Sequence, residues 1–272
     1  MKQHIRSLYK MLRLGFLKAR VVEMVARLWV DQLVMRSPDT DLRLFPDISA
    51  IRAVAILVPH PDDEVIGCYH FINEIGKSVA VDLYYVTDGG AGEIQAESIS
   101  LSDRRVDESG RATVGMPIRN REWWDFPDGN LSGHREVLHN RLEMLVEYDL
   151  VLCPAPTDIT PDHAVLADVL LRSVNIEKLL WYRSTWLTFP LSASDYAVCG
   201  DAAQKRRALR CFISQRNLAL GNTITLSGFE ARLCGSNASS IEAFRYAISG
   251  SLGWHPVNIL SISAIKKLKE WY

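Results

Sequence analysis

From residue 49 onward, the sequence alternates short apolar runs with longer segments whose apolar residues recur at helical spacing. Strands that are apolar on both sides need cover on both faces, and their alternation with helices is typical of a parallel sheet with crossover helices. We therefore expect an α/β, Rossmann-like fold with a mostly parallel sheet and helices on both faces. The expected strands are residues 53–58, 79–86, 123–126, 150–153 and 179–185, and the expected helices are residues 64–74, 102–114, 134–148, 164–173 and 201–220.

Residues 1–45 precede this alternation, and we expect them to form an N-terminal helical extension. Apolar residues among Lys and Arg follow a helical period through about residue 36, which predicts an amphipathic helix. Such a helix packs either on protein, which includes a second subunit, or on an anionic membrane surface. Trp29, Val30 and Leu33 resemble packing residues, so the sequence favours protein over membrane association.

Residues 46–272 are expected to form one domain, because no repeat, low-complexity tract or Pro/Gly-rich linker divides them. Only the region near the C-terminus is ambiguous. Gly, Ser and Asn are dense over residues 227–240, and the basic segment 265–269 predicts a short surface helix.

Charge and cysteine usage restrict the partners and the compartment. The 31 Lys and Arg residues nearly balance 32 Asp and Glu residues, whereas a nucleic-acid-binding surface needs a basic excess. We therefore expect a small-molecule or glycoconjugate substrate and no nucleic acid. The five cysteines are widely spaced, and no apolar stretch reaches the roughly 20 residues that cross a bilayer. These features predict a cytoplasmic protein and leave an oligomer open.

A polar cluster follows the first expected strand directly. His60, Asp62 and Asp63 stand between that strand and a helix, and ligands in open α/β sheets bind beyond the carboxyl ends of strands. An Asp at this position also serves commonly as a helix cap. Capping would explain one aspartate but neither the second one nor the histidine.

His163 occupies the corresponding position after the strand at residues 150–153. Together with His60 and Asp63 it would supply two imidazoles and one carboxylate, a ligand set of catalytic zinc that leaves positions for water and substrate. Taken alone, His163 would more often be an ordinary surface or capping histidine.

The two clusters together resemble the LmbE-like, or PIG-L, family. Residues 59–64, PHPDDE, are similar to the A/P-H-P-D-D-E signature of that family, and residues 158–163 are similar to its D-x-H-x-D-H motif. Weaker similarities extend the resemblance over about residues 53–215. They include Thr87 to Glu93, Arg105 with Glu108 and Ala112, Asp128 with Gly129, and Lys205 with Ser214 and Gln215.

The resemblance implies a Zn²⁺-dependent hydrolase that removes the acetyl group from an N-acetylated amino sugar, such as an N-acetylglucosamine conjugate. By resemblance His60, Asp63 and His163 bind one zinc per chain, and Asp62 is the general base. The resemblance also implies that Arg105 and Asp128 contact the substrate.

Three further residues near these motifs have open roles. Asp162 would either orient a ligand imidazole or cap the following helix. The Trp123–Trp124 pair could stack on a sugar, although alternation along a strand would send one ring into the core.

One position departs from the family pattern, because Thr160 stands where D-x-H-x-D-H has its first His. A Thr hydroxyl is no proton donor near neutral pH, so Asp62 would serve as base and then as acid. Three alternatives stay open. They are a hydrolase of the same family that acts on another amide, a catalytically silent sugar-binding protein, which Thr160 would allow, and a structural or partner-binding α/β domain.

Overall fold

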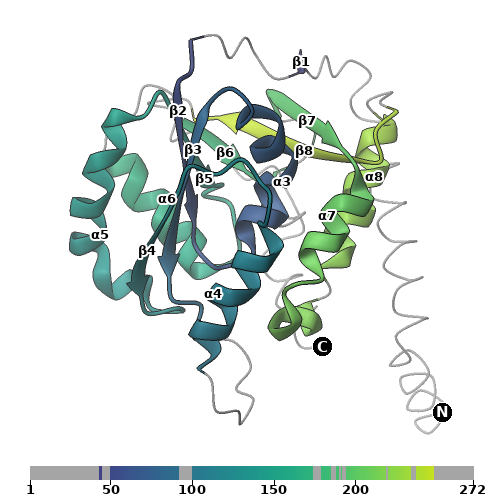
Figure 1. The fold of residues 1–272 in the computed structure, drawn as a ribbon. Helices are drawn as coiled ribbons and strands as arrows, with labels where there is room; N and C mark the ends of the chain where they lie inside the picture. The colour runs from purple at the N-terminus through teal and green to yellow at the C-terminus, as the bar shows by residue number, and fades with distance from the viewer. Residues whose placement is uncertain are drawn as a thin grey trace, which may run out of the picture.

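The strands of the computed structural model form one eight-stranded sheet in the order β1-β7-β8-β6-β5-β2-β3-β4 (Figure 1). The structure describes residues 43–44, 50–91, 100–173, 179–184, 188–189, 191, 194–218, 220–233 and 237–247. The strands are β1 (Arg43–Leu44), β2 (Ala53–Val58), β3 (Ala80–Thr87), β4 (Asn120–Phe126), β5 (Leu150–Pro154), β6 (Leu179–Tyr182), β7 (Tyr196–Gly200) and β8 (Ser240–Tyr246).

The sheet is mostly parallel, as the sequence predicts. β2 pairs in parallel with β3 and β5, β3 with β4, β5 with β6, and β1 with β7, whereas β8 runs antiparallel to β6 and β7. The chain moves outward from β2 to β3 and β4 and then returns to β5 on the other side of β2. Ligands bind outside the carboxyl ends of strands at such a reversal. A site is therefore expected between the ends of β2 and β5.

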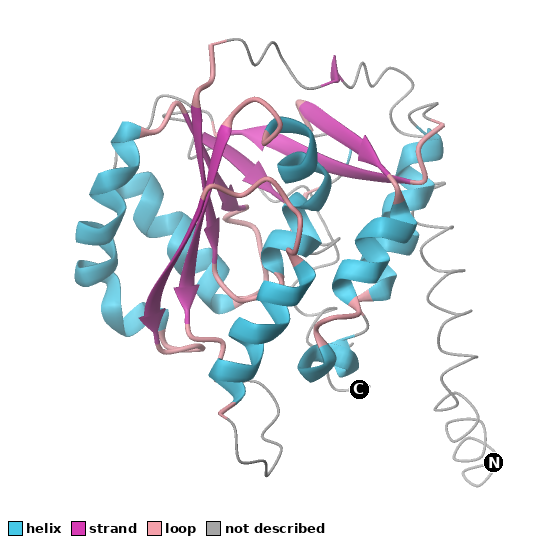
Figure 2. Cartoon of the chain, in the orientation of Figure 1, coloured by secondary structure: helices cyan, strands magenta, loops and turns pink. Residues whose placement is uncertain are grey.

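Helices cover both faces of the sheet (Figure 2). On one face, α5 and α6 pack over the sheet together with the short helices η1 and η2. On the other face lies α3, and α4, α7 and α8 pack against α3 in a shared apolar cluster. Their bounds are α3 (Asp63–Ile75), α4 (Leu101–Ala112), η1 (Leu131–His134), α5 (Arg135–Leu142), η2 (Glu143–Glu147), α6 (Pro161–Ser173), α7 (Ala202–Leu209), η4 (Ile213–Leu218) and α8 (Gly221–Leu233).

β2 shows why a continuous apolar run forms a central strand. Val54, Ile56 and Val58 pack on the face that α3 covers, while Ala55 and Leu57 pack on the face that α5 and α6 cover. All five side chains are fully buried. Because successive residues of a strand point to opposite faces, a strand between two helix layers must be apolar at every position.

β4 contradicts the expectation that every predicted strand is buried on both sides. It is an edge strand paired only with β3 among the described strands, and its first three residues are exposed or half-buried. Trp124 is buried against α5 on one face, while the half-buried Trp123 stacks on Tyr85 on the other, with centroids 3.8 Å apart. Both rings of the tryptophan pair therefore contribute to packing.

The predicted helix over residues 201–220 is wrong in length. Asp201 caps α7 by accepting a 2.7 Å hydrogen bond from the Ala203 amide, but α7 ends at Leu209. Beyond it, the amide and hydroxyl of Ser214 donate to the carboxylate of Glu108 on α4, at 2.9 and 2.6 Å. These bonds hold the chain against α4, where η4 replaces a continued helix. The predicted helix 134–148 is likewise divided into η1, α5 and η2.

The sequence prediction does not include β7 or β8. β8 was missed because it begins in a polar segment, and two of its residues, Ser240 and Glu242, are buried polar side chains.

The predicted helices over residues 1–36 and 265–269 lie outside the described residues. Within the described part of the chain, no helix combines the length and apolar character that crossing a membrane requires.

A buried ion pair joins β8 to α3 and α7. Lys205 Nζ donates to Glu242 Oε1 at 2.6 Å and to the Ile66 carbonyl at 2.7 Å, and Glu242 also accepts the amides of His70 and Phe71 at 3.0 Å. The side chains of Lys205 and Glu242 are 3% and 2% exposed, so neither charge has water as an alternative partner. The pair is therefore coupled strongly to the packing of β8 on the domain.

Replacing Lys205 with Met should destabilise the fold by about 3–5 kcal/mol, because Glu242 would keep a buried charge without its cation. Chemical denaturation followed by circular dichroism measures this loss. Lys77→Met is the matched control, since the Lys77–Glu74 pair is 66% and 68% exposed and should contribute about 0–1 kcal/mol. Equal losses in the two variants would contradict a structural role for the buried pair.

Candidate metal centre

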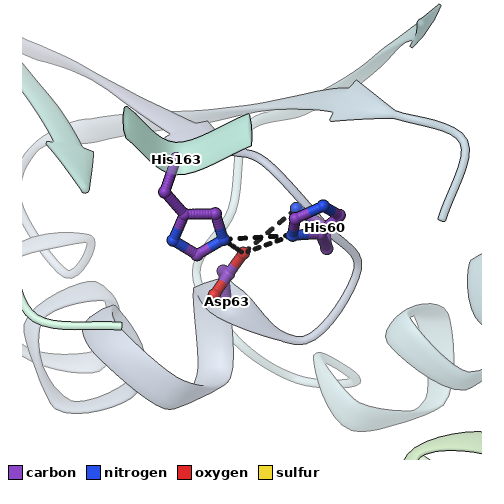
Figure 3. Close-up of side chains that lie close together, drawn as sticks. All are labelled: His60, Asp63 and His163. Carbon is purple, nitrogen blue, oxygen red and sulfur yellow. Dashed lines mark hydrogen bonds and ion pairs between the residues drawn. The ribbon is translucent and has the colours of Figure 1, made fainter. Parts of the chain in front are cut away.

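Three side chains with metal-ligating atoms meet where β2 and β5 end (Figure 3). His60 Nδ1 lies 3.0 Å from His163 Nε2 and 3.5 Å from Asp63 Oδ2. His163 Nε2 lies 3.0 Å from the same Asp63 oxygen. The structure thus brings together the three residues that the sequence suggests as zinc ligands.

The two loops after β2 and β5 each lead into a helix whose first turn carries a ligand. Asp63 is the first residue of α3, and its Oδ2 accepts a 3.1 Å hydrogen bond from the backbone amide of His60. His163 is the third residue of α6. Because these helices pack on opposite faces of the sheet, they fix the ligands from two sides of the reversal between β2 and β5.

The spacing of the three atoms fits zinc. Zinc bonds of about 2.0–2.2 Å in tetrahedral geometry put neighbouring ligand atoms roughly 3.3–3.6 Å apart. The observed separations of 3.0, 3.0 and 3.5 Å are within a few tenths of an ångström of that range. Two imidazole nitrogens and one carboxylate oxygen are also the donor types that zinc prefers.

Carboxylates fix the ring of His60 from its other side. His60 Nε2 lies 3.1 Å from Asp128 Oδ1 and 3.3 Å from Asp162 Oδ2, so an N–H at Nε2 leaves Nδ1 free as a ligand. Asp162 therefore contacts His60 and not its neighbour His163. The capping alternative for Asp162 is wrong, because α6 begins at Pro161 and the Asp162 carboxylate accepts the amides of Gly129 and Leu131 at 2.7 and 3.1 Å.

Asp158 fixes the second imidazole, a role that the sequence analysis missed. Its Oδ2 lies 2.9 Å from His163 Nδ1, and the hydroxyl of Ser184 also contacts both groups. The Nδ1 hydrogen then points away from the cluster, and Nε2 is left to bind a metal. The available signal was the first Asp of the 158–163 motif, whereas Ser184 follows β6 and has no sequence signal.

The charges around the cluster favour a cation. Burial alone would lower the pKa of His163, but Asp63 and Asp158 on its two sides outweigh that effect and raise the pKa to about 9. The pKa of His60 is also raised well above its ordinary value, because Asp128, Asp162 and Asp63 outweigh burial. The carboxylates thus favour positive charge at this cluster, and a metal ion would compete with protons for the same imidazole nitrogens.

Asp62 is free for chemistry because it does not cap α3 with its side chain. It stands at the N-cap position with φ 151° and without a side-chain capping bond. Its Oδ2 instead accepts a 3.1 Å hydrogen bond from the Arg105 guanidinium. Burial raises the pKa of Asp62 to about 8, in spite of Arg105, which lowers it. The capping alternative is therefore wrong for Asp62.

Arg105 and Asp128 lie at the same centre. The Arg105 guanidinium donates to the Pro61 and Gly89 carbonyls at 2.9 and 3.3 Å, and its NH1 lies 3.7 Å from Asp128 Oδ2. The side chain of Arg105 is only 5% exposed, and that of Asp128 is 11% exposed. Of the two residues expected to bind substrate, Asp128 is therefore the more accessible.

Comparison with known proteins agrees with the motifs. Residues 55–174 match the family model described as PIG-L, GlcNAc-PI de-N-acetylase. A comparison with curated protein sequences gave no match.

Solved structures with the same fold have different activities. N,N'-diacetylchitobiose deacetylase from Pyrococcus horikoshii is 21% identical at a TM-score of 0.62, over 81% of this chain and 92% of that one. The 4-carboxy-2-hydroxymuconate hydratase GalB from Pseudomonas putida is 14% identical at 0.57, over 73% and 97%. The A40926 pseudoaglycone deacetylase Dbv21 is 19% identical at 0.52, over 73% and 99%. At these identities the likeness establishes the fold alone.

Purified protein should bind one zinc per chain, and the His60→Ala/His163→Ala double variant should lose it, because one carboxylate cannot hold the ion. Atomic emission after dialysis measures the metal content. A double substitution of His134 and His139, away from the cluster, is the control and should keep the zinc. Stoichiometric zinc in the His60/His163 variant would overturn the ligand assignment.

Zinc affinity should rise with pH, because the metal must displace imidazole protons. With the pKa of His163 raised to about 9, each proton displaced should improve the apparent dissociation constant by about tenfold per pH unit between roughly pH 6 and 9. Calorimetry in buffers of different ionisation enthalpy counts the protons released. An affinity that is flat over this range would show that the imidazoles are already neutral in the metal-free protein.

Proposed function

The chain belongs to the PIG-L family through residues 55–174, and from this premise we propose that it is a metal-dependent hydrolase that removes the acetyl group from an N-acetylated amino sugar. The substrate would be an N-acetylglucosamine-type conjugate. The observation that carries the proposal is the convergence of His60, Asp63 and His163 beside an Asp62 carboxylate that no cap occupies.

In this proposal His60, Asp63 and His163 hold one zinc ion, with Asp128, Asp158 and Asp162 orienting the two imidazoles. When bound, zinc would acidify a water molecule and polarise the amide carbonyl of the substrate.

Asp62 carries both proton transfers of the proposed reaction. It accepts a proton as the water oxygen bonds to the acetyl carbon, and it returns that proton to the nitrogen as the C–N bond breaks and the amine leaves. The second water proton stays on the acetic acid formed, which ionises to acetate in solution. A group with this double task works best with a pKa near the operating pH, and burial raises the pKa of Asp62 to about 8. Thr160 stands where the second motif, residues 158–163, usually has a His, so that motif supplies no further proton donor beside Asp62.

Asp128 and Arg105 form the substrate side of the proposed site. Carboxylates and guanidinium groups bind sugar hydroxyls through charge-assisted hydrogen bonds. The Nε of Arg105 is buried and has no hydrogen-bond partner among the described residues. Since Asp128 also contacts His60, a hydroxyl bound by Asp128 would lie close to the metal ligands.

The remaining features are proposed on sequence grounds. Residues 46–272 are proposed as the deacetylase domain, to whose sheet β1 of the preceding segment adds a short strand by pairing with β7. That preceding segment, residues 1–45, is proposed to pack on protein, which leaves membrane association as the less favoured alternative. The protein acts in the cytoplasm on a small molecule or glycoconjugate.

A second candidate activity deserves a direct comparison, because the hydratase GalB has the same fold. A hydratase also activates water but releases no acetate. Acetate release from a panel of N-acetylhexosamine conjugates therefore distinguishes deacetylation from hydration. Amides with other acyl groups, tested in the same panel, separate an acetyl-specific enzyme from a hydrolase of another amide.

Asp62→Asn should retain zinc but lose about 10²–10⁴-fold in deacetylation rate, because the amide has nearly the same shape and cannot accept the proton. We expect the upper end of that range if Asp62 performs both transfers. Rate and zinc content are measured on the same sample, with Asp168→Asn on the exposed side of α6 as control. Full activity in the Asp62 variant would place the base elsewhere, and loss of zinc would make Asp62 a ligand.

A further inference from the structure

Glu64 is a buried acid beside the centre that no proposed step uses. Its side chain is fully buried, with an exposed fraction of 0%. One carboxylate oxygen accepts a 2.9 Å hydrogen bond from the backbone amide of Asp62, and the other accepts a 2.6 Å bond from the Ser109 hydroxyl. The hydroxyl of Tyr85 lies 2.8 Å from Ser109. Both oxygens of Glu64 are thus committed to the protein and not to a ligand.

The amide that Glu64 accepts belongs to a residue in an unusual backbone conformation. Asp62 has φ 151° and ψ −24°, a region that residues other than glycine rarely occupy and that costs about 1–3 kcal/mol. Such a conformation persists only where the surroundings hold it. The Asp62 carbonyl accepts the amides of Val65 and Ile66 at 3.0 and 2.9 Å, as at an ordinary helix start. Its amide donates to Glu64, and its carboxylate accepts from Arg105.

The hydrogen bonds at the start of α3 differ from those of a usual helix cap. At the start of a helix, the N-cap side chain ordinarily accepts an amide of its own first turn. Here the second residue of α3 turns back and accepts the N-cap amide instead. The Asp62 carboxylate is then released from the helix and meets Arg105 beside the metal-ligating residues.

We propose that Glu64 is a positioning residue, which holds the backbone of Asp62 in its strained conformation and thereby aims the Asp62 carboxylate at the reacting water. The inference rests on the proposed function, because it assumes that Asp62 is the base. Ser109 and Tyr85 set the rotamer of Glu64 and contribute only through it. Glu64 touches neither substrate nor metal in this proposal.

The test compares Glu64→Leu, which removes the acceptor, with Glu64→Gln, which keeps an acceptor oxygen. Glu64→Leu should lower kcat by about 10²-fold at unchanged KM and zinc content, since misplacing a catalytic group by about 1 Å has that effect. Glu64→Gln should retain most of the activity. Ser109→Ala is the matched control in the same buried chain and should change kcat less than Glu64→Leu, because the Asp62 amide keeps its acceptor.

A double-mutant cycle separates positioning from general stabilisation. In the Asp62→Asn background, Glu64→Leu should cause no further loss of kcat, because the group that Glu64 aims is already disabled. A purely structural role would lower the rate by the same factor in both backgrounds. Additive losses, or a Glu64→Leu enzyme within threefold of the wild-type kcat, would overturn the proposal.

Amide hydrogen exchange supplies a readout that needs no substrate. The Asp62 amide should exchange slowly in wild-type protein and in Glu64→Gln, and it should exchange quickly in Glu64→Leu with the core amides of β2 unchanged. Protection that survives Glu64→Leu would contradict the positioning bond. If no conjugate is deacetylated but the exchange follows this pattern, the proposed function fails while the bond from Glu64 to Asp62 stands.

Discussion

The parallel pairing of β2 with β5 is the constraint on which the rest of the site depends. The register joins Val54 to Leu150 and Ile56 to Leu152, so both strands end at the same edge of the sheet. Residues about a hundred positions apart in sequence then start helices beside each other. Because α3 and α6 cover opposite faces, their first turns approach the strand ends from two sides. The metal-ligating cluster is a consequence of this pairing.

The electrostatics of the centre follow from crowding carboxylates around two imidazoles. Isolated buried carboxylates would take up protons, as the raised pKa of Asp62 shows. Asp63 differs, because contacts from His163 and His60 outweigh burial and hold its pKa well below the ordinary value. Two neighbouring aspartates of one motif thus have opposite protonation tendencies. The one that stays ionised suits a metal ligand, and the one whose pKa lies near neutral pH can accept a proton and then return it.

Much of the fold follows from the sequence, because β2, β3, β5 and β6 are apolar at nearly every position. β8 could not be predicted in this way, since its buried Glu242 depends on Lys205, which is distant in sequence. The ligand cluster was predictable from motifs at strand ends. The contacts that support the ligands were harder to predict. Asp162 contacts His60, which follows a different strand, instead of its sequence neighbour His163, and Ser184 contacts His163 from the segment after β6. Contacts between residues of separate elements leave no pattern in the local sequence, so the sequence alone does not predict them.

Residues of the weaker sequence motifs make contacts between separate elements of the fold. Glu108 of the R-x-x-E helix accepts both bonds of Ser214, which joins α4 to η4. Lys205 pairs with Glu242, which joins α7 to β8. Arg105, about one turn before Glu108 on α4, donates to Asp62. One helix therefore anchors the outer layer through Glu108 and restrains the proposed base through Arg105.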